Sequence, residues 1–170
     1  MSEAQLDYAT VAYDAATGEQ LWSSRYDDPV QGTDDARAIA VSEDGSTVVV
    51  TGQSQGEDTG LTDWGTVAYD AATGDQLWDV LRNGTEGQID ISGQVQIAGD
   101  TVIVSGVVSN TDRQGDWSTV AYDLATGEER WSAEHGGPGT DTPQASTASP
   151  DGSTVLVTGN VEGDTGMDYA

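Results

Sequence analysis

The chain has 170 residues, and its 30 acidic residues against five Arg and no Lys leave a formal net charge of −25. Nucleic-acid binding draws most of its affinity from Lys and Arg, so this charge balance excludes nucleic acid as a partner. No window approaches the roughly 20 consecutive apolar residues of a membrane helix, so membrane insertion is not expected. The absence of Cys excludes disulfides, thiolate zinc sites and a cysteine nucleophile.

The composition predicts a folded protein in spite of the high charge. Hydrophobic residues make up 35% of the chain, and five Trp and six Tyr recur among Val-rich runs. An acid excess without Lys is typical of proteins from concentrated salt, where cations screen the repulsion between carboxylates. An acidic secreted protein is the alternative.

The first element of the chain, residues 8–22, returns twice without gaps, at residues 64–78 and 117–131. A fourth copy begins at Asp168, Tyr169 and Ala170, so the starts of the copies lie 56, 53 and 52 residues apart. This period is typical of a β-propeller, in which each repeat forms one four-stranded blade.

Each repeat has the pattern of two β-hairpins. The first hairpin is expected over residues 9–14 and 20–26, with an Ala-Thr-Gly turn between its strands. Two extended runs around a tight turn follow at residues 36–53, at 88–107 in a divergent form, and at 144–160. Val, Ile, Thr, Tyr and Trp dominate these runs, and helical spacing of apolar residues is absent, so essentially no helix is expected.

The turn of the first hairpin in each repeat carries the same two residue types. A glycine stands where the loop needs a left-handed backbone: Gly18, Gly74 and Gly127. An aspartate four residues earlier is expected to accept hydrogen bonds from the turn's own amides: Asp14, Asp70 and Asp123. These aspartates are therefore interpreted as structural.

The expected fold is a single all-β unit over residues 1–170, a propeller segment of about three four-stranded antiparallel blades. With strands labelled A to D from the propeller axis outward, residues 7–26 supply strands C and D of a first blade. Residues 36–83 form the second blade and 88–134 the third. Residues 143–170 supply strands A and B and the start of C of a further blade.

The string A-x-D-x-x-T-G-[ED]-x-x-W resembles the tryptophan-docking motif of PQQ-like β-propeller repeats, and the longer frame is similar to the seven-bladed propeller repeats called SBBP. In such propellers the Trp packs between adjacent blades and the Thr-Gly turn shapes the outer hairpin. The third blade departs from the pattern, because SGQVQIAGD replaces the AVSEDGS form of its inner hairpin. The motif residues are Ala12, Asp14, Thr17, Gly18, Trp22, Ala68, Asp70, Thr73, Gly74, Trp78, Ala121, Asp123, Thr126, Gly127 and Trp131.

Three blades leave two apolar end faces, because stacked repeats bury these faces only against neighbours. Two explanations remain open. The chain is a fragment of a longer gene product, or two copies join as a six-bladed homodimer in which the C and D strands of one complete the A and B strands of the other.

The sequence offers no catalytic residues. The PQQ-dependent enzymes that share the motif imply a PQQ and Ca²⁺ site, often with a vicinal Cys pair, and Cys is absent here. His135 is the only histidine, and no Ser stands in a G-x-S-x-G context. A glycosidase would need two carboxylates at a defined separation, which sequence cannot supply. Acidic loops that could donate oxygen ligands to Ca²⁺ point to four candidates on one face: Asp34, Asp35, Asp58 and Asp63.

The resemblance implies a non-catalytic binding or scaffold module of a larger extracellular or cell-surface protein, although the segment shows no secretory signal pattern at its start. Its ligand, protein or carbohydrate, is expected at the loop-rich face or central channel. The alternatives are the propeller part of a PQQ-dependent quinoprotein oxidoreductase, and a self-assembling half-propeller.

Overall fold

The computed structural model describes residues 6–27, 32–55, 61–83, 90–109, 115–136, 139–163 and 166–169. Within these ranges the chain is all-β and contains no helix, as the sequence predicted. The strands are β1 (Tyr8–Tyr13), β2 (Gln20–Tyr26), β3 (Asp35–Val41), β4 (Thr47–Gln55), β5 (Thr62–Asp70), β6 (Gln76–Arg82), β7 (Ile91–Ala98), β8 (Thr101–Ser109), β9 (Gly115–Asp123), β10 (Glu129–His135), β11 (Thr142–Ala148), β12 (Val155–Gly163) and β13 (Gly166–Tyr169).

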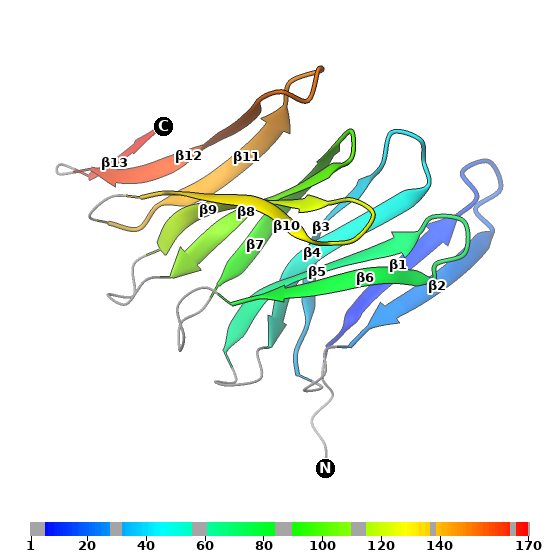
Figure 1. Ribbon diagram of the computed structural model, residues 1–170. Helices are drawn as coiled ribbons and strands as arrows, with labels where there is room; N and C mark the ends of the chain where they lie inside the picture. The colour runs from blue at the N-terminus through cyan, green and yellow to red at the C-terminus, as the bar shows by residue number, and fades with distance from the viewer. Residues whose placement is uncertain are drawn as a thin grey trace, which may run out of the picture.

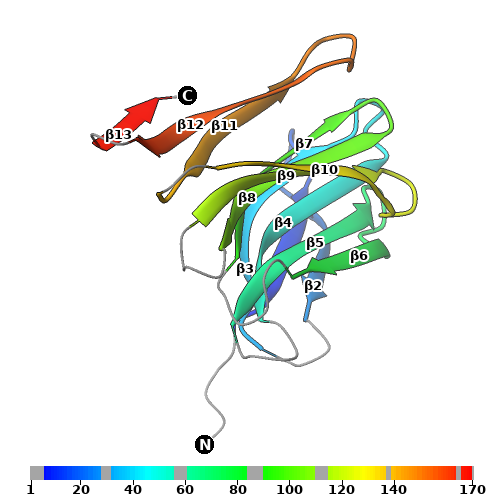
Figure 2. The ribbon, with the colours of Figure 1, turned by 60° about the vertical axis from the view of Figure 1, so that its left-hand side comes forward.

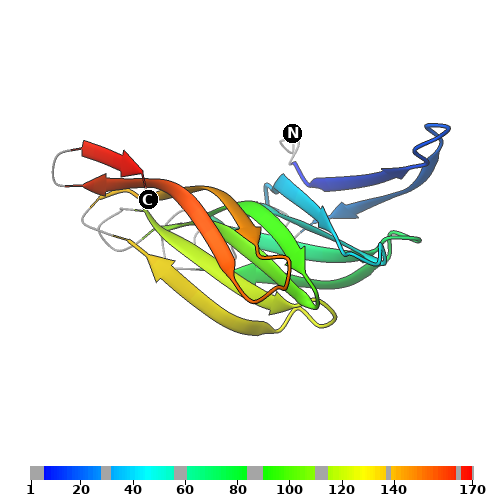
Figure 3. The ribbon, with the colours of Figure 1, turned by 90° about the horizontal axis from the view of Figure 1, so that it is seen from above.

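These strands form four antiparallel sheets that stand side by side in chain order (Figures 1 and 3). Two are complete four-stranded blades, β3–β4–β5–β6 and β7–β8–β9–β10. The pair β1–β2 lies at one side of them, and the three-stranded sheet β11–β12–β13 lies at the other. Figure 2 shows the same order from a second direction. This arrangement is the expected run of propeller blades.

Equivalent strands of the four sheets take the same place in each. Strand A is β3, β7 or β11, and strand B is β4, β8 or β12. Strand C is β1, β5 or β9, with β13 as the first part of a fourth copy, and strand D is β2, β6 or β10. The C–D pairs share an irregular register next to the repeated tryptophan: Ala12 pairs with Trp22 and Tyr13 with Gln20. Such a bulge re-aims a side chain at a defined position of a strand.

The A–B hairpin of the third blade is shorter than its neighbours. Strands β7 and β8 are joined through Gly99 and Asp100 alone, with Ala98 paired to Thr101. In the second blade, residues 42–46 separate β3 from β4. The divergent sequence SGQVQIAGD therefore keeps the strand pairing and changes the length of the turn, and the positive φ of 58° at Gly99 fits a two-residue hairpin loop.

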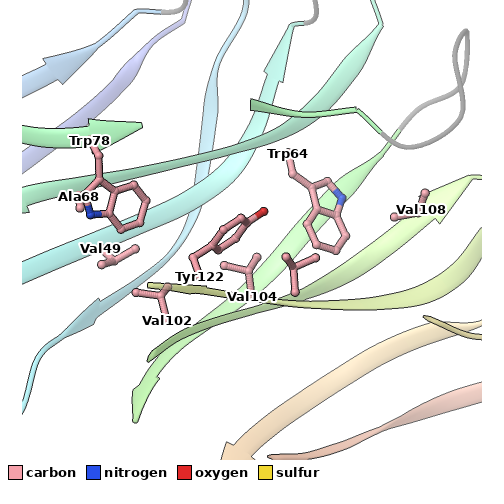
Figure 4. Close-up of a cluster of buried hydrophobic side chains, with 9 residues drawn as sticks. Val49, Trp64, Ala68, Trp78, Val102, Val104, Val108 and Tyr122 are labelled. Atoms are coloured by element: carbon pink, nitrogen blue, oxygen red, sulfur yellow. The ribbon is translucent and has the colours of Figure 1, made fainter. Parts of the chain in front are cut away.

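The core lies between the blades. Trp64, Trp78 and Tyr122 belong to one buried cluster between the second and third blades, together with Val49, Ala68, Val102, Val104, Val108 and Val120. Figure 4 shows Trp64 and Trp78 on either side of the Tyr122 ring. A second cluster joins β1–β2 to the second blade and contains Tyr8, Tyr26, Val48, Val50, Val67 and Tyr69. Burial of these large side chains between sheets drives the stacking of one blade on the next.

Candidate functional site

The motif tryptophans Trp22 and Trp78 hold neighbouring sheets together. The indole Nε1–H of Trp22 donates to the carbonyl oxygen of Ala71 at 2.9 Å, and that of Trp78 donates to Leu124 at 2.9 Å. Both carbonyls lie in the C–D turn of the next blade. Trp78 is buried and Trp22 is half-buried, so each indole gains a hydrogen-bond partner where its ring leaves water.

A second aromatic anchor, which the sequence analysis did not single out, lies at the start of each C strand. The Tyr8 hydroxyl donates to the carbonyl of Gln53 at 3.1 Å. At the equivalent position Trp64 Nε1–H donates to Val107 at 3.1 Å, and Trp117 Nε1–H donates to Asn160 at 3.3 Å. These aromatics were visible in the sequence as the first residues of the repeats.

A glycine next to each of these accepting carbonyls makes room for the aromatic ring. A Cβ on Gly106 would lie 2.2 Å from the Ile91 carbonyl oxygen and 2.9 Å from the Trp64 ring. The equivalent positions, Gly52 and Gly159, are equally crowded. The glycine in the middle of each B strand, which follows Thr51, Ser105 or Thr158, is therefore a packing feature of the blade interface.

Trp131 differs from its two counterparts. Its side chain is 41% exposed, and within the described part of the chain no C–D turn lies against it. On the opposite end of the molecule, nothing lies within 4 Å of the Cβ position of Gly18, whereas the same position of Gly74 is 2.7 Å from the Trp22 ring. The resemblance implied packing between blades for all three tryptophans, and the described residues supply a partner for two.

The aspartates of the motif stabilise their own turns. Asp14 Oδ1 accepts the backbone N–H of Ala16 at 3.0 Å and of Thr17 at 2.8 Å, and also the Thr17 hydroxyl at 2.8 Å. Asp70 and Asp123 repeat this pattern. The Thr17 contacts lower the pKa of the Asp14 carboxyl below its usual range, because they stabilise the ionised form.

The A–B turns are held by aspartates in the same way. Hydrogen bonds from the hydroxyl of Ser42 and from Ser46 lower the pKa of Asp44 to about 2. Hydrogen bonds from the equivalent residues Ser149 and Ser153 lower the pKa of Asp151 to about 2. In the short third turn, the Arg130 guanidinium lowers the pKa of Asp100 to about 2.

A carboxylate cluster, formed by Asp7, Asp27 and Asp34, places one oxygen of each within 4.8 Å of the others. Arg25 forms an ion pair with Asp7, and Asp34 accepts a hydrogen bond from Ser54. Of the four calcium candidates named from the sequence, only Asp34 belongs to this cluster. Asp7 and Asp27 were missed because their distance from Asp34 depends on how β1–β2 stacks on the second blade.

The other calcium candidates lie elsewhere. Asp35 is exposed and forms an ion pair with Arg37 at 2.8 Å. Asp63 is buried at the start of β5. Asp58 lies outside the described residues. The structure therefore gathers one of the predicted ligands with two others, and a calcium site stays a prediction.

His135 lies at the end of β10 and its ring packs against Trp117, with ring centroids 5.2 Å apart. The equivalent pair in the first sheet is Tyr26 and Tyr8, with centroids 5.4 Å apart. The histidine thus takes a place that an aromatic residue fills in another repeat. The His135 ring therefore packs beside strand β12, because Val155 and Val157 of that strand line the same hollow.

A groove of about 680 Å³ crosses the short A–B turn of the third blade. It exists because this turn is short while its neighbours at residues 42–46 and 149–154 project on both sides. Main-chain and small polar groups form its floor, and three acidic side chains border it. The lining includes Val41, Glu43, Gln96, Asp100, Thr147 and Asp151.

The described arginines do not provide a site for PQQ, a tricarboxylate that requires cations around it. Arg25, Arg37, Arg82 and Arg130, the four that the structure describes, each form an ion pair with an acidic side chain of the chain itself. A free cationic pocket for three further carboxylates is therefore missing from the described ranges, and these residues do not fit the cofactor.

The stacked sheets, the Asp-capped turns and the aromatic anchors between the sheets define the chain as a run of β-propeller blades. The family model described as outer membrane protein assembly factor BamB matches residues 5–163. The chain belongs to this family of PQQ-like β-propeller proteins.

A solved structure agrees with this fold. The crystal structure of BamB from Moraxella catarrhalis has a TM-score of 0.53 and 22% sequence identity over 89% of the present chain. The match covers 36% of the BamB chain, so the present sequence spans about a third of that protein's length. No curated protein matches the sequence. The described residues also contain no helix long and apolar enough to cross a membrane.

Proposed function

We propose that this chain is a non-catalytic propeller module that binds an extended, basic segment of a partner protein in the groove above the third blade. The groove itself carries this proposal, because it is the place where one blade departs from the repeat and creates a concave surface. In repeat proteins the loops that form binding surfaces vary in sequence and length, whereas the repeated strands that support them are kept. The family description, an assembly factor, favours a protein ligand over a carbohydrate.

The distribution of perturbed carboxyl groups supports a non-catalytic role. Catalytic carboxylates are usually recognised by pKa shifts that burial and a nearby charge cause in a cleft. Among the described residues, the carboxyl groups with a lowered pKa include six exposed or half-buried turn aspartates, and hydrogen bonds from the same turns or from Arg130 lower the pKa of each. These groups stabilise hairpins, and none of them needs a substrate to explain its pKa.

The charge of the groove sets the class of partner. Glu43, Asp100 and Asp151 border it, and the whole chain carries a net charge of −25. Asp100 is already paired with Arg130 at 2.8 Å, so Glu43 and Asp151 are the carboxylates open to a ligand's cations. An extended segment with Arg or Lys would complement this border, and its main chain would lie over the short turn.

A turn graft tests the groove. Residues 98–101 are replaced by the six residues 42–47 of the second blade, which fills the hollow and adds one acidic residue. A fluorescein-labelled peptide of alternating Arg and Thr is the probe, measured by anisotropy in molar KCl. We expect the graft to weaken binding at least tenfold despite its extra charge. Equal or tighter binding would show that the probe senses net charge alone and would overturn the groove.

The same protein preparation tests the enzymatic alternative. PQQ is added with Ca²⁺, and the absorbance of bound cofactor is followed after removal of free PQQ. We expect no retained cofactor, because the described arginines are already paired. Retention of PQQ would replace the scaffold proposal by that of a quinoprotein oxidoreductase.

We propose further that the module works outside the cell or at its surface, in concentrated salt. The family description, an outer membrane protein assembly factor, supports the location, and the acid excess without Lys supports the salt adaptation. The dependence of the melting temperature on salt concentration tests the second part.

A further inference from the structure

The short turn of the third blade occurs together with a cation that the equivalent positions of the first two sheets lack. Arg130 on β10 stands directly before the repeated tryptophan, at the place of Leu21 on β2 and Leu77 on β6. Both leucines are exposed, so core packing does not explain the difference. The same blade has the short turn at Gly99 and Asp100. The change from Leu to Arg therefore accompanies the change of turn that forms the groove.

The Arg130 guanidinium binds both oxygens of the Asp100 carboxylate. Nη1 donates to Oδ1 at 2.8 Å and Nη2 donates to Oδ2 at 2.9 Å, which is the bidentate geometry of a strong charge-assisted pair. Nη1 also donates to the Thr101 hydroxyl at 2.6 Å, and Nη2 donates to Asp123 at the end of β9 at 2.6 Å. The Asp100 side chain is 81% exposed, so a ligand can reach it. Its charge is nevertheless compensated within the blade.

The main chain of the short turn has supports of its own. The carbonyl oxygen of Asp100 accepts the backbone N–H of Leu124 at 2.9 Å. The carbonyl oxygen of Leu124 in turn accepts the Trp78 indole N–H at 2.9 Å. In the second blade, whose D strand carries a leucine, the Ala71 N–H donates to the Ser46 carbonyl at the same distance. Main-chain bonds therefore hold the turn in place, and the guanidinium contributes the compensation of a carboxylate.

The three acidic side chains that border the groove thus differ in their effective charge. The second, third and fourth sheets stand in this order, so Asp100 lies between Glu43 and Asp151 (Figure 1). The hydroxyls of Ser149 and Ser153 donate to Asp151, and neutral donors leave its negative charge in place. The border is therefore negative toward its two ends and compensated at its centre. A cation over the centre would gain little from the paired carboxylate and would be repelled by the guanidinium.

We propose that Arg130 determines the charge pattern of the ligand: the groove takes a segment with basic residues toward its two ends and a neutral residue where it crosses the short turn. The inference rests on the proposed function, in which the groove binds a basic segment. Arg130 acts through Asp100, and its removal would leave a third free carboxylate at the centre. The removal should therefore change which segment binds more than whether a segment binds.

Two fluorescein-labelled peptides test this pattern. Both have an Arg pair at each end and Thr between the pairs, and one of them has a further Arg at its centre. Anisotropy in molar KCl, which screens the attraction to distant carboxylates, gives the ratio of the two dissociation constants. The wild type should bind the peptide with the central Arg no more tightly than the other. Arg130→Leu should bind it about threefold more tightly, which is the size expected for an exposed ion pair.

Three further variants locate the effect. Arg130→Gln also removes the cation and should show the same preference. Arg37→Leu removes an equal charge and frees Asp35 at the start of β3, whose other end reaches the groove, so it should keep the wild-type ratio. Asp100→Asn combined with Arg130→Leu should lose the preference, because the freed carboxylate is gone. Circular dichroism in the same buffer confirms that each variant folds.

The outcomes separate this role of Arg130 from the groove itself. An equal ratio in the wild type and in both Arg130 variants overturns the role of Arg130, and the groove stands if both peptides bind and the turn graft weakens that binding. A preference for the central Arg that is also present in the wild type or in Arg37→Leu overturns the role as well. A wild-type chain that binds neither peptide overturns the groove and, with it, the role of Arg130.

Discussion

The indole Nε1–H of Trp78 donates to the carbonyl oxygen of Leu124 at 2.9 Å, and this contact joins the D strand of one blade to the C–D turn of the next. The ring of Trp78 lies 2.8 Å from the position that a Cβ of Gly127 would take. Trp78 therefore buries apolar surface, satisfies its indole N–H with a hydrogen bond and packs closely against the turn at Gly127. It stabilises the stacking of the second and third blades together with Trp64, which donates across the same interface.

Replacement of Trp78 by Ala should destabilise the protein by about 3–5 kcal/mol, since it removes a buried aromatic ring and its hydrogen bond. Trp131→Ala is the matched control, because the same residue type at the equivalent position is exposed. At dilute concentration it should change the free energy of unfolding by no more than about 0.5 kcal/mol. Urea denaturation in molar KCl measures both. Similar losses for the two variants would contradict the assignment of Trp78 as an interface anchor.

Gly106→Ala should destabilise the protein by about 1–3 kcal/mol or more, because the new Cβ meets the Ile91 carbonyl oxygen and the Trp64 ring in a well-packed interface. Gly93, on the same A–B hairpin, is the control: nothing lies within 4 Å of its Cβ position. Repeat-equivalent bulge positions carry Arg37 and Gln144, so Gly93→Ala should be neutral or slightly stabilising. The melting temperatures of the Gly106→Ala and Gly93→Ala variants, compared with that of the wild type, test this prediction. A tolerated Gly106→Ala would show that the second anchor is loosely packed.

Removal of the Asp44 charge should lower the free energy of unfolding near neutral pH and have little effect in strong acid. Its folded pKa of about 2 lies below the model-compound value of 3.8, so its contribution is complete above pH 4 and disappears as pH falls toward 2. In molar KCl, Asp44→Asn should therefore be less stable than wild type at pH 6, and the difference should shrink between pH 4 and 2. The neighbouring Glu43→Gln removes an equal charge from the same turn and is the matched control for the loss of charge alone. A constant gap would argue against the Ser42 and Ser46 contacts.

Salt should stabilise the folded chain strongly. With 30 acidic and five basic residues, repulsion among carboxylates opposes the compact state, and molar KCl screens it. The melting temperature should rise steeply from low to molar KCl. Equal ionic strengths of NaCl and KCl should act alike if screening is the cause. A flat response would remove the proposed adaptation to concentrated salt.

The repeat period and the alternation of Val, Thr, Tyr and Trp were sufficient to predict an all-β run of propeller blades, because strand pairing and turn formation depend on local residue patterns. The Asp14 turn could be predicted for the same reason, because the backbone amides that donate hydrogen bonds to Asp14 lie within three residues of it. The divergent third-blade hairpin was also visible as a change in turn sequence.

The contacts between blades were decided by the tertiary structure. Tyr8 and Gln53, or Asp7 and Asp34, meet only because one sheet stacks on the next, and no local pattern records that distance. The groove likewise depends on the relative projection of three turns from three sheets. The sequence by itself determined what each blade is, because its strands and turns are local. The stacking of the blades determined which side chains are anchors, which are exposed and where a concave surface forms.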